Sequence, residues 1–294
     1  MQNSVQERQS WLKLISILSF IFLLGVLTVL GERGDIDMNM DDPKTIFVLK
    51  LLQGVSSILI FIIPSILFAV FWTEAKIAYL GIIKKPFSST IFIASMGMLM
   101  ALPLINWLAQ INEKMQLPLS LSNIERWMQN SEAKAEILTR AFTAGSEVEV
   151  LVVNLIVIAL LAAISEEFFF RGILQKVLIE CFKNKHLAVW SAAIIFSAFH
   201  MQFYGFLPRM LMGAYLGYLF LWSGSLWVSI AAHFANNGMA VFLIWLSNRG
   251  VVKEDVDTIG TGGEMEWIPV LISCVMIVAS LLLIYKTEAK NKTV

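Results

Sequence analysis

Six polar side chains, among them two carboxylates and two imidazoles that can do acid–base chemistry, lie inside strongly apolar stretches of the second half of the chain. An ionisable group at the centre of a membrane helix costs about 2.5–3.5 kcal/mol on insertion scales, so such groups usually face the bundle interior and pair. Carboxylates and imidazoles can activate water, and imidazole and amide donors can hold an oxyanion. The six residues are Glu166, Glu167 and Arg171 in "ISEEFFFRG", His200 in "FSAFH", and His233 and Asn237 in "HFANN".

The spacing within two of these motifs places side chains on one face of a helix. Glu167 and Arg171 are four residues apart, so they can form an ion pair along one helix. Glu166 is rotated by about 100° from Glu167 and can point into the bundle, where it could act as a general base or acid. His233 and Asn237 are also four residues apart, so both can project toward one point.

Each feature taken alone also fits a role in packing. The pair Glu167–Arg171 by itself favours a structural ion pair, and His200 fits a helix–helix hydrogen bond as well as it fits catalysis. Gly213 and Gly217 in "GAYLG" form a GxxxG pattern, which favours close helix packing. The joint occurrence of acids, histidines and an amide on three apolar segments favours a functional site.

The composition is that of an integral membrane protein. Of the 294 residues, 57% are hydrophobic and 15% are charged, and the apolar residues come in blocks near the ~20 residues that a helix needs to cross a bilayer. The net charge is zero, which gives no electrostatic case for nucleic-acid binding. Cys181 and Cys274 lie far apart, so they predict neither a disulfide framework nor a CxxC metal site.

We expect an all-α, polytopic integral membrane bundle of about eight transmembrane helices, with both termini in the cytoplasm and a bacterial inner (cytoplasmic) membrane as its location. Basic residues in the short loops and at both ends favour this orientation. The segment 208–222 is short enough to be re-entrant or tilted. The candidate spans are 11–30, 52–72, 89–109, 150–170, 187–206, 208–222, 226–246 and 267–285.

The fourth span can be drawn in two ways that place its acids at different depths. If the helix ended at Arg171, Glu166 would lie near the membrane surface while His200 would lie deep in its own span. The apolar run continues as "GILQKVLIECF", and one helix over 150–182 would be roughly 48 Å long at 1.5 Å per residue. That longer helix would bring Glu166 closer to the level of His200.

The three motifs, in this order on successive helices, resemble the signature of a known family. "EEFFFR" matches EExxxR, "FSAFH" matches FxxxH and "HFANN" matches HxxxN. The set is similar to that of the CPBP family of intramembrane endopeptidases, named after CAAX proteases and bacteriocin-processing proteins and including the Rce1-type prenyl-protein endopeptidases. The resemblance implies water activation by Glu166 with His200, oxyanion stabilisation by His233 and Asn237, and support of the acid by Glu167 and Arg171.

Three regions are expected along the chain. Residues 1–147 would hold N-terminal spans and an interfacial helical outer loop, 148–246 the CPBP-like catalytic core, and 247–294 an outer loop and the final span with a cytoplasmic tail. In the first region Ser122 and Glu125 match a capping box, which predicts one or two interfacial helices.

Two alternatives stay open at this level. Glu166, His200 and His233 could be three ligands of a catalytic zinc with water in the fourth position, although no HExxH is present; metal-free catalysis without a cofactor is favoured. The substrate would be a peptide or a membrane protein, lipidated or not. A non-enzymatic immunity or scaffold factor, or a proton-coupled transporter, is the alternative function, and transporters more often show the inverted repeats that are not seen here.

Overall fold

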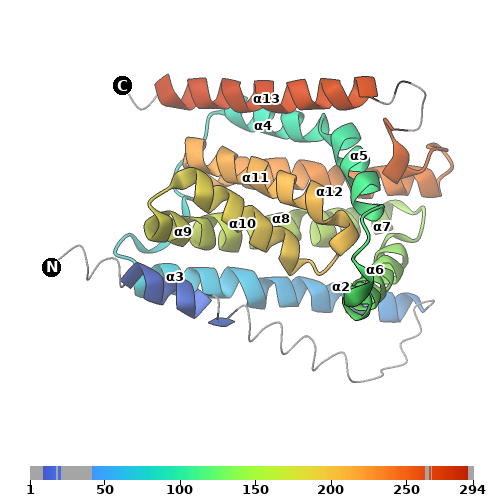
Figure 1. The fold of residues 1–294 in the computed structure, drawn as a ribbon, viewed down its shortest axis with the longest axis horizontal. Helices are drawn as coiled ribbons and strands as arrows, with labels where there is room; N and C mark the ends of the chain where they lie inside the picture. The colour runs from blue at the N-terminus through green and yellow to red at the C-terminus, as the bar shows by residue number, and fades with distance from the viewer. Residues whose placement is uncertain (1–8, 18, 21–41, 262–264, 266, 291–294) are drawn as a thin grey trace.

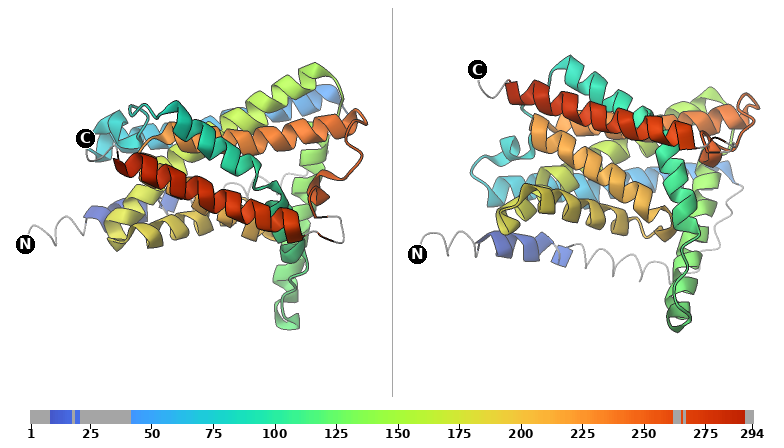
Figure 2. Two further views of the ribbon diagram at one scale, coloured as in Figure 1. Left: turned by 90° about the horizontal axis from the view of Figure 1, so that it is seen from above. Right: turned by 45° about the horizontal axis from the view of Figure 1, so that its top comes forward.

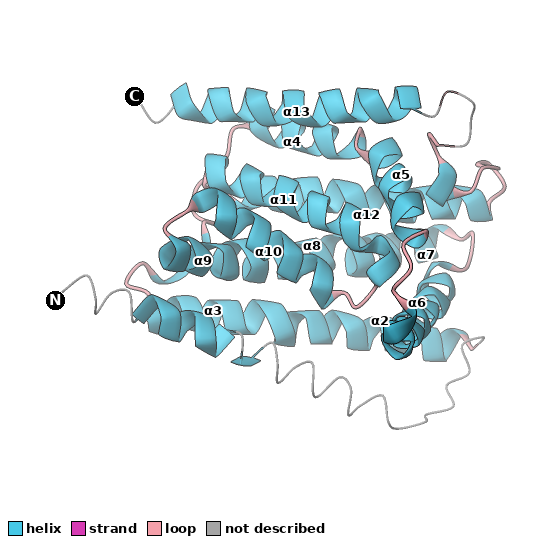
Figure 3. Ribbon diagram, in the orientation of Figure 1, coloured by secondary structure: helices cyan, strands magenta, loops and turns pink. Residues whose placement is uncertain are grey.

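The computed structural model describes residues 9–17, 19–20, 42–261, 265 and 267–290, and all regular structure in these residues is helical (Figure 3). Two pairs of helices form opposite sides of the bundle (Figure 1). One side consists of α2 (Pro43–Ser57) and α3 (Ile63–Trp72), and the other of α4 (Ser88–Leu99) and α13 (Trp267–Lys290). Between them lie six further helices, of which α8, α10 and α12 carry the motifs: α7 (Val148–Asn154), α8 (Ala162–Phe169), α9 (Gln175–Phe182), α10 (Lys185–Phe199), α11 (Phe206–Ser223) and α12 (Leu226–Asn248).

The expected all-α membrane bundle is confirmed, whereas the number of eight spans stays a prediction. Among the described residues, four helices are long and apolar enough to cross a membrane, or five if the pair of α4 and α5 (Leu102–Glu113), bent by 41°, is one span. The four are Pro43–Trp72, Val148–Phe182, Leu226–Asn248 and Trp267–Glu288. Most of the expected span 11–30 lies outside the described residues.

Both glutamates of the first motif lie near the middle of one long helix. The helix runs for 35 residues from Val148 to Phe182, as the longer of the two alternatives predicted. The expected span 150–170 was therefore too short. Two π-helical turns, Leu155–Leu161 and Phe170–Leu174, flank α8 on either side. Such turns change the register of the side chains that follow and are frequent at functional sites.

Two sequence predictions about helix ends were wrong. The expected span 187–206 ends early, because α10 stops at Phe199 and His200 follows it as the cap residue. Met201 adopts a left-handed φ of 55°, the conformation that commonly ends a helix, so His200 lies at a helix end and not deep within a span. Ser122 does not cap its helix either: a 3₁₀ turn leads directly into α6 (Ser122–Thr143), whose cap position is Leu121.

The helix α6 lies crosswise over one end of the bundle (Figures 1 and 2). It is a single helix of 22 residues, which fits the interfacial helix expected near Ser122 and Glu125, although the side of the membrane on which it lies stays a prediction. The ring of Trp127 packs on Phe203, with centroids 5.1 Å apart. Asn154 Nδ2 donates to the carbonyl of Phe142 at 3.0 Å, which ties the end of α6 to α7.

Glycines bring α11 close to its neighbours, as the GxxxG pattern predicted. A Cβ on Gly213 would lie 3.1 Å from the ring of Phe196 and 3.2 Å from the Cα of Ala193, both on α10. The carbonyl of Gly213 accepts a hydrogen bond from Arg171, and the carbonyl of Gly217 accepts one from the side chain of Gln175. Gln175 follows Arg171 by one turn on the long helix. The close approach therefore exposes backbone oxygens to polar side chains of the long helix.

Candidate active site

Glu167 and Arg171 form a buried ion pair, as their four-residue spacing predicts. Their side chains are 0% and 1% exposed, and Arg171 Nη1 lies 2.6 Å from Glu167 Oε1. Arg171 Nη2 donates to the carbonyl of Gly213 at 2.9 Å, and the guanidinium stacks on the ring of Phe196. A buried charge is tolerated when it has both a partner charge and further hydrogen bonds, and this pair has both.

His233 is joined to the same carboxylate. Its Nδ1 lies 2.8 Å from Glu167 Oε1, the oxygen that also accepts from Arg171. Because a carboxylate paired with an arginine acts as an acceptor, Nδ1 of His233 carries the proton. The neutral ring therefore presents an Nε2 lone pair on its other side, and Nε2 becomes a donor only in the doubly protonated ring.

Glu166 meets both histidines on the opposite side from the ion pair. Its Oε2 lies 3.7 Å from His233 Nε2 and 3.8 Å from His200 Nε2, and it has no hydrogen-bond partner in the described part of the chain. His200 Nδ1 bonds to the carbonyl of Phe196 at 2.8 Å, so this ring too carries its proton on Nδ1. Both separations exceed a hydrogen bond and match the distance that a bridging water spans.

The amide of Asn237 is oriented by its neighbour. Asn236 Nδ2 donates to Asn237 Oδ1 at 3.2 Å, which leaves the Nδ2 group of Asn237 as its available donor. Asn236 lies outside the HxxxN motif, and it nonetheless holds the Oδ1 atom of the motif amide. Both asparagines line the same cavity as His233.

The four expected catalytic side chains line a single cavity of about 520 Å³. Glu166 comes from α8, His200 from the end of α10, and His233 and Asn237 from α12. The helix α6 supplies further wall residues: Ala135, Leu138, Thr139, Phe142 and Thr143. The structure thus brings together residues from three motifs under a helix that carries none of them.

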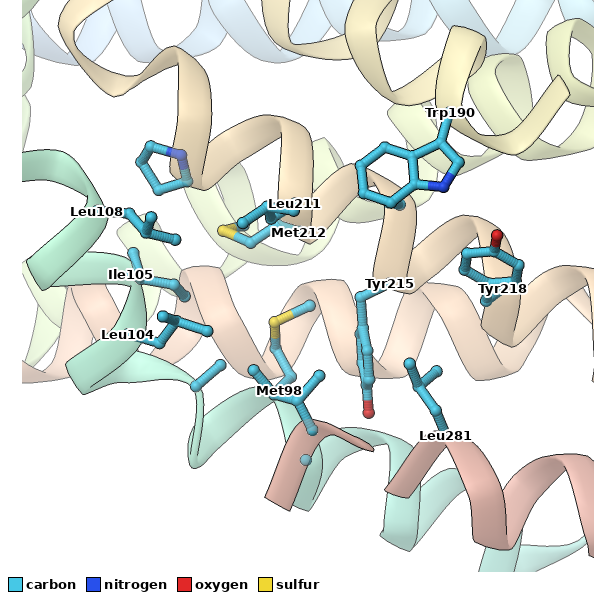
Figure 4. Close-up of a pocket in the computed structure, with 15 residues that line it drawn as sticks. Met98, Leu104, Ile105, Leu108, Trp190, Leu211, Met212, Tyr215, Tyr218 and Leu281 are labelled. Carbon is cyan, nitrogen blue, oxygen red and sulfur yellow. The ribbon is translucent and has the colours of Figure 1, made fainter. Parts of the chain in front are cut away.

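A second, apolar pocket adjoins this cavity. It has a volume of about 210 Å³, and Ile105, Pro208 and Met212 line both it and the cavity. Figure 4 shows the side chains that surround it, among them Met98, Leu108, Trp190, Leu211, Tyr215 and Leu281. An apolar group could therefore lie next to a peptide in the cavity.

Arg209 also lines the cavity and was not among the residues predicted from the sequence. Its Nη1 donates to the carbonyl of Gln202 and its Nη2 to Gln202 Oε1, both at 3.0 Å. The signal was present in "GFLPRMLMG", where an arginine interrupts an apolar run just as Glu166 does.

The zinc alternative depends on the positions of the donor atoms around Glu166. Each histidine has its Nδ1 held by an acceptor, the arrangement common around zinc-bound histidines. However, four-coordinate zinc with bonds of 2.0–2.1 Å needs its ligand atoms about 3.3 Å apart, and Glu166 Oε2 is 3.7 and 3.8 Å from the two nitrogens. No three His, Cys, Asp or Glu side chains in the described ranges gather closely enough to hold a metal ion, so the residues as arranged do not fit one.

The region that holds these residues is similar to known proteins. Residues 148–239, about a third of the chain, match the family described as "Type II CAAX prenyl endopeptidase Rce1-like". The uncharacterized protein YpbD of Bacillus subtilis (strain 168) is 33% identical over 85 residues, which are 28% of this chain and 40% of that relative. The match thus spans less than half the length of the curated relative. No solved structure matches the chain. Residues 148–239, the stretch similar to the Rce1-like family, hold all six motif side chains.

Proposed function

We propose that this protein is an intramembrane endopeptidase that hydrolyses a peptide bond with a water activated by Glu166 and His200. The observation that carries the proposal is the approach of Glu166 Oε2 to Nε2 of His200 and of His233, at 3.8 and 3.7 Å, inside a cavity of about 520 Å³. The match of residues 148–239 to an endopeptidase family supports the same class of reaction.

The first step is attack by water. A water bound between Glu166 and His200 gives one proton to the carboxylate and donates its other hydrogen to the Nε2 lone pair of the imidazole. Its oxygen adds to the peptide carbonyl carbon, and the carbonyl electron pair moves onto oxygen. The bond from His200 Nδ1 to the carbonyl of Phe196 keeps the acceptor nitrogen toward the water.

The second step needs donors for the oxyanion. Asn237 offers its amide N–H, and His233, whose Nδ1 is held by the carboxylate of Glu167, offers a second donor at Nε2 when its ring is doubly protonated. When the intermediate collapses, the C–N bond breaks and the leaving amine takes the proton from Glu166. The products are a new carboxyl terminus and a new amino terminus, and no step requires a metal.

The substrate in this proposal is a membrane-associated or lipidated peptide or protein, reached from the lipid bilayer. The apolar pocket next to the cavity supports a substrate with a large apolar group close to the cleaved bond. The location in a bacterial inner membrane, with both termini in the cytoplasm, remains part of the proposal.

The test is cleavage of quenched fluorescent peptides, apolar and either prenylated or plain, by protein purified in detergent. We expect Glu166→Gln to lower kcat by about 10²–10⁴-fold, the usual contribution of a general base. Glu149→Gln is the matched control, since Glu149 is exposed at the start of the same long helix, and it should keep wild-type activity. A chelator should leave activity unchanged; loss that zinc restores would replace the metal-free mechanism by a metal-dependent one.

The alternative functions give different results. A folded wild-type protein that cleaves none of the peptides would support the immunity or scaffold role. Proton flux into liposomes that Glu166→Gln abolishes would support a transporter. Either result would contradict the endopeptidase proposal.

A further inference from the structure

Arg209 holds a positive charge inside the cavity, and its bonds among the described residues go to a neutral side chain and a backbone carbonyl. No carboxylate of the described residues lies within ion-pair distance of it, and Gln202 is its hydrogen-bond partner. The acids whose charges act on Arg209 are Glu132 on α6 and Glu166, both beyond contact distance. A largely buried cation is costly unless it meets an anion, so an anion bound in the cavity would stabilise it.

The guanidinium is already held in one position. Gln202 receives two of its five N–H donors, one through a backbone carbonyl and one through the side chain. The donors that remain are therefore preorganised, and a planar guanidinium is suited to bind a carboxylate through two parallel hydrogen bonds. Gly205 permits this placement, because a Cβ there would lie 2.9 Å from Arg209 Nη2.

The charges around the cavity indicate an anion with one negative charge. Arg171 is already paired with Glu167 beneath the site, so Arg209 is the cation left for a ligand among the residues described as lining the cavity. Glu132 nearby opposes a second negative charge. A single carboxylate fits this balance better than a phosphate dianion does.

We propose that Arg209 binds a carboxylate of the substrate and thereby determines which peptide bond faces Glu166. The inference rests on the proposed endopeptidase function and adds a substrate feature to it. The carboxylate can be the free C-terminus of a peptide or the side chain of an internal Asp or Glu. Arg209 is then a substrate-binding residue, whereas Glu166 acts on the water.

Binding to an inactive protein tests this without relying on cleavage. Three fluorescent apolar decapeptides would be titrated against Glu166→Gln protein: one with a free C-terminus, the same sequence with a C-terminal amide, and the amide with one internal residue replaced by Glu. We expect at least one carboxylate peptide to bind 10-fold or more tightly than the plain amide. Adding Arg209→Gln should remove this preference, and adding Arg209→Lys should restore part of it.

Hydrolysis of the same peptides by active protein gives the second readout. Arg209→Gln should raise KM for the preferred carboxylate peptide by 10-fold or more, change kcat less than 3-fold, and leave the plain amide peptide unaffected. An equal loss for all three peptides would assign Arg209 a structural role. No carboxylate preference in binding, or no binding at all, would also overturn the inference.

The two proposals fail in distinguishable ways. Cleavage that depends on Glu166 but is indifferent to Arg209 overturns the substrate-carboxylate inference and leaves the endopeptidase. Carboxylate binding that depends on Arg209, in a folded wild-type protein that cleaves none of the peptides, overturns the endopeptidase and leaves the binding site.

Discussion

Nδ1 of His233 lies 2.8 Å from Oε1 of Glu167, a residue 66 positions earlier on another helix. The same oxygen accepts from Arg171, so one carboxylate links the first motif to the third. The two adjacent glutamates therefore have separate surroundings. Glu167 lies in a buried network of charge and hydrogen bonds, whereas Glu166 faces the cavity and the two Nε2 atoms.

Glu167→Gln should destabilise the protein much more than Glu166→Gln. Removing the charge leaves Arg171 buried without its partner, and breaking a buried pair typically costs about 3–5 kcal/mol. Glu166→Gln removes no hydrogen bond between described residues, so we expect a change below about 1 kcal/mol. The free energies of unfolding of the two variants, measured in the same detergent, give the difference.

Combining Glu167→Gln with Arg171→Met provides the control. Both changes remove the same ion pair, so the double variant should lose less stability than the sum of the two single losses. Equal destabilisation by the Glu166 and Glu167 variants would contradict separate roles for the two acids.

Contacts within one helix were predictable from the sequence because they depend only on helical geometry. The Glu167–Arg171 pair followed from its four-residue spacing. The close packing of another helix at Gly213 also followed from a local pattern, GxxxG. The bond between Glu167 and His233 did not, since it depends on how α8 packs on α12. Spacing alone placed the ring of His233 beside Asn237 and gave no reason to connect it with the first motif.

Two further features needed the fold. The predicted depth of His200 was wrong. The apolar run of the sequence continues past Phe199, but the helix ends there and the backbone turns at Met201, with a φ of 55°. Arg209 carried the same signal as the motif residues, a charge in an apolar segment, but belonged to no recognised pattern. Its place in the cavity arises from the packing of α11 against α10.

Asn237→Ala should lower kcat by about 10²–10³-fold, the usual effect of removing one oxyanion donor, while KM changes little because the donor acts on the transition state. Asn236→Ala should cause a smaller loss, since it removes only the hydrogen bond that orients the motif amide. Steady-state kinetics with a cleaved peptide compares them. A larger effect from Asn236 than from Asn237 would show that the donor is misassigned.

Gly213→Ala should destabilise the bundle by about 1–3 kcal/mol, as overpacking of a filled interior does. The new Cβ would lie 3.1 Å from Phe196 and 3.2 Å from Ala193, which forces α11 away from α10 and shifts the carbonyl that holds Arg171. Gly238→Ala on α12 is the matched control, because its Cβ would meet Leu155 at an ordinary 3.6 Å, and the higher helix propensity of alanine should make it neutral or stabilising. Equal unfolding temperatures for the two variants would contradict close packing at Gly213.

Glu132 on α6 should make stability depend on pH. Burial raises the pKa of its carboxyl above the ordinary value of 4.5, although the backbone N–H of Tyr204 and the charge of Arg209 act in the opposite direction. Because the folded pKa is above the unfolded one, the native state holds more protons in the window that starts near pH 4.5. Stability should therefore fall as pH rises through that window to the folded pKa, and then level off.

Glu132→Gln removes this titration and keeps a side chain that can accept from Tyr204. The variant should match the wild type at pH 4 and become progressively more stable than it toward pH 7. Unfolding temperatures of the two proteins, measured at half-unit steps of pH, test the sign of the effect. Parallel curves would mean that folding leaves the pKa of Glu132 unchanged, and a wild type that gains on the variant as pH rises would mean that the fold stabilises the charged form of Glu132 by more than its burial costs.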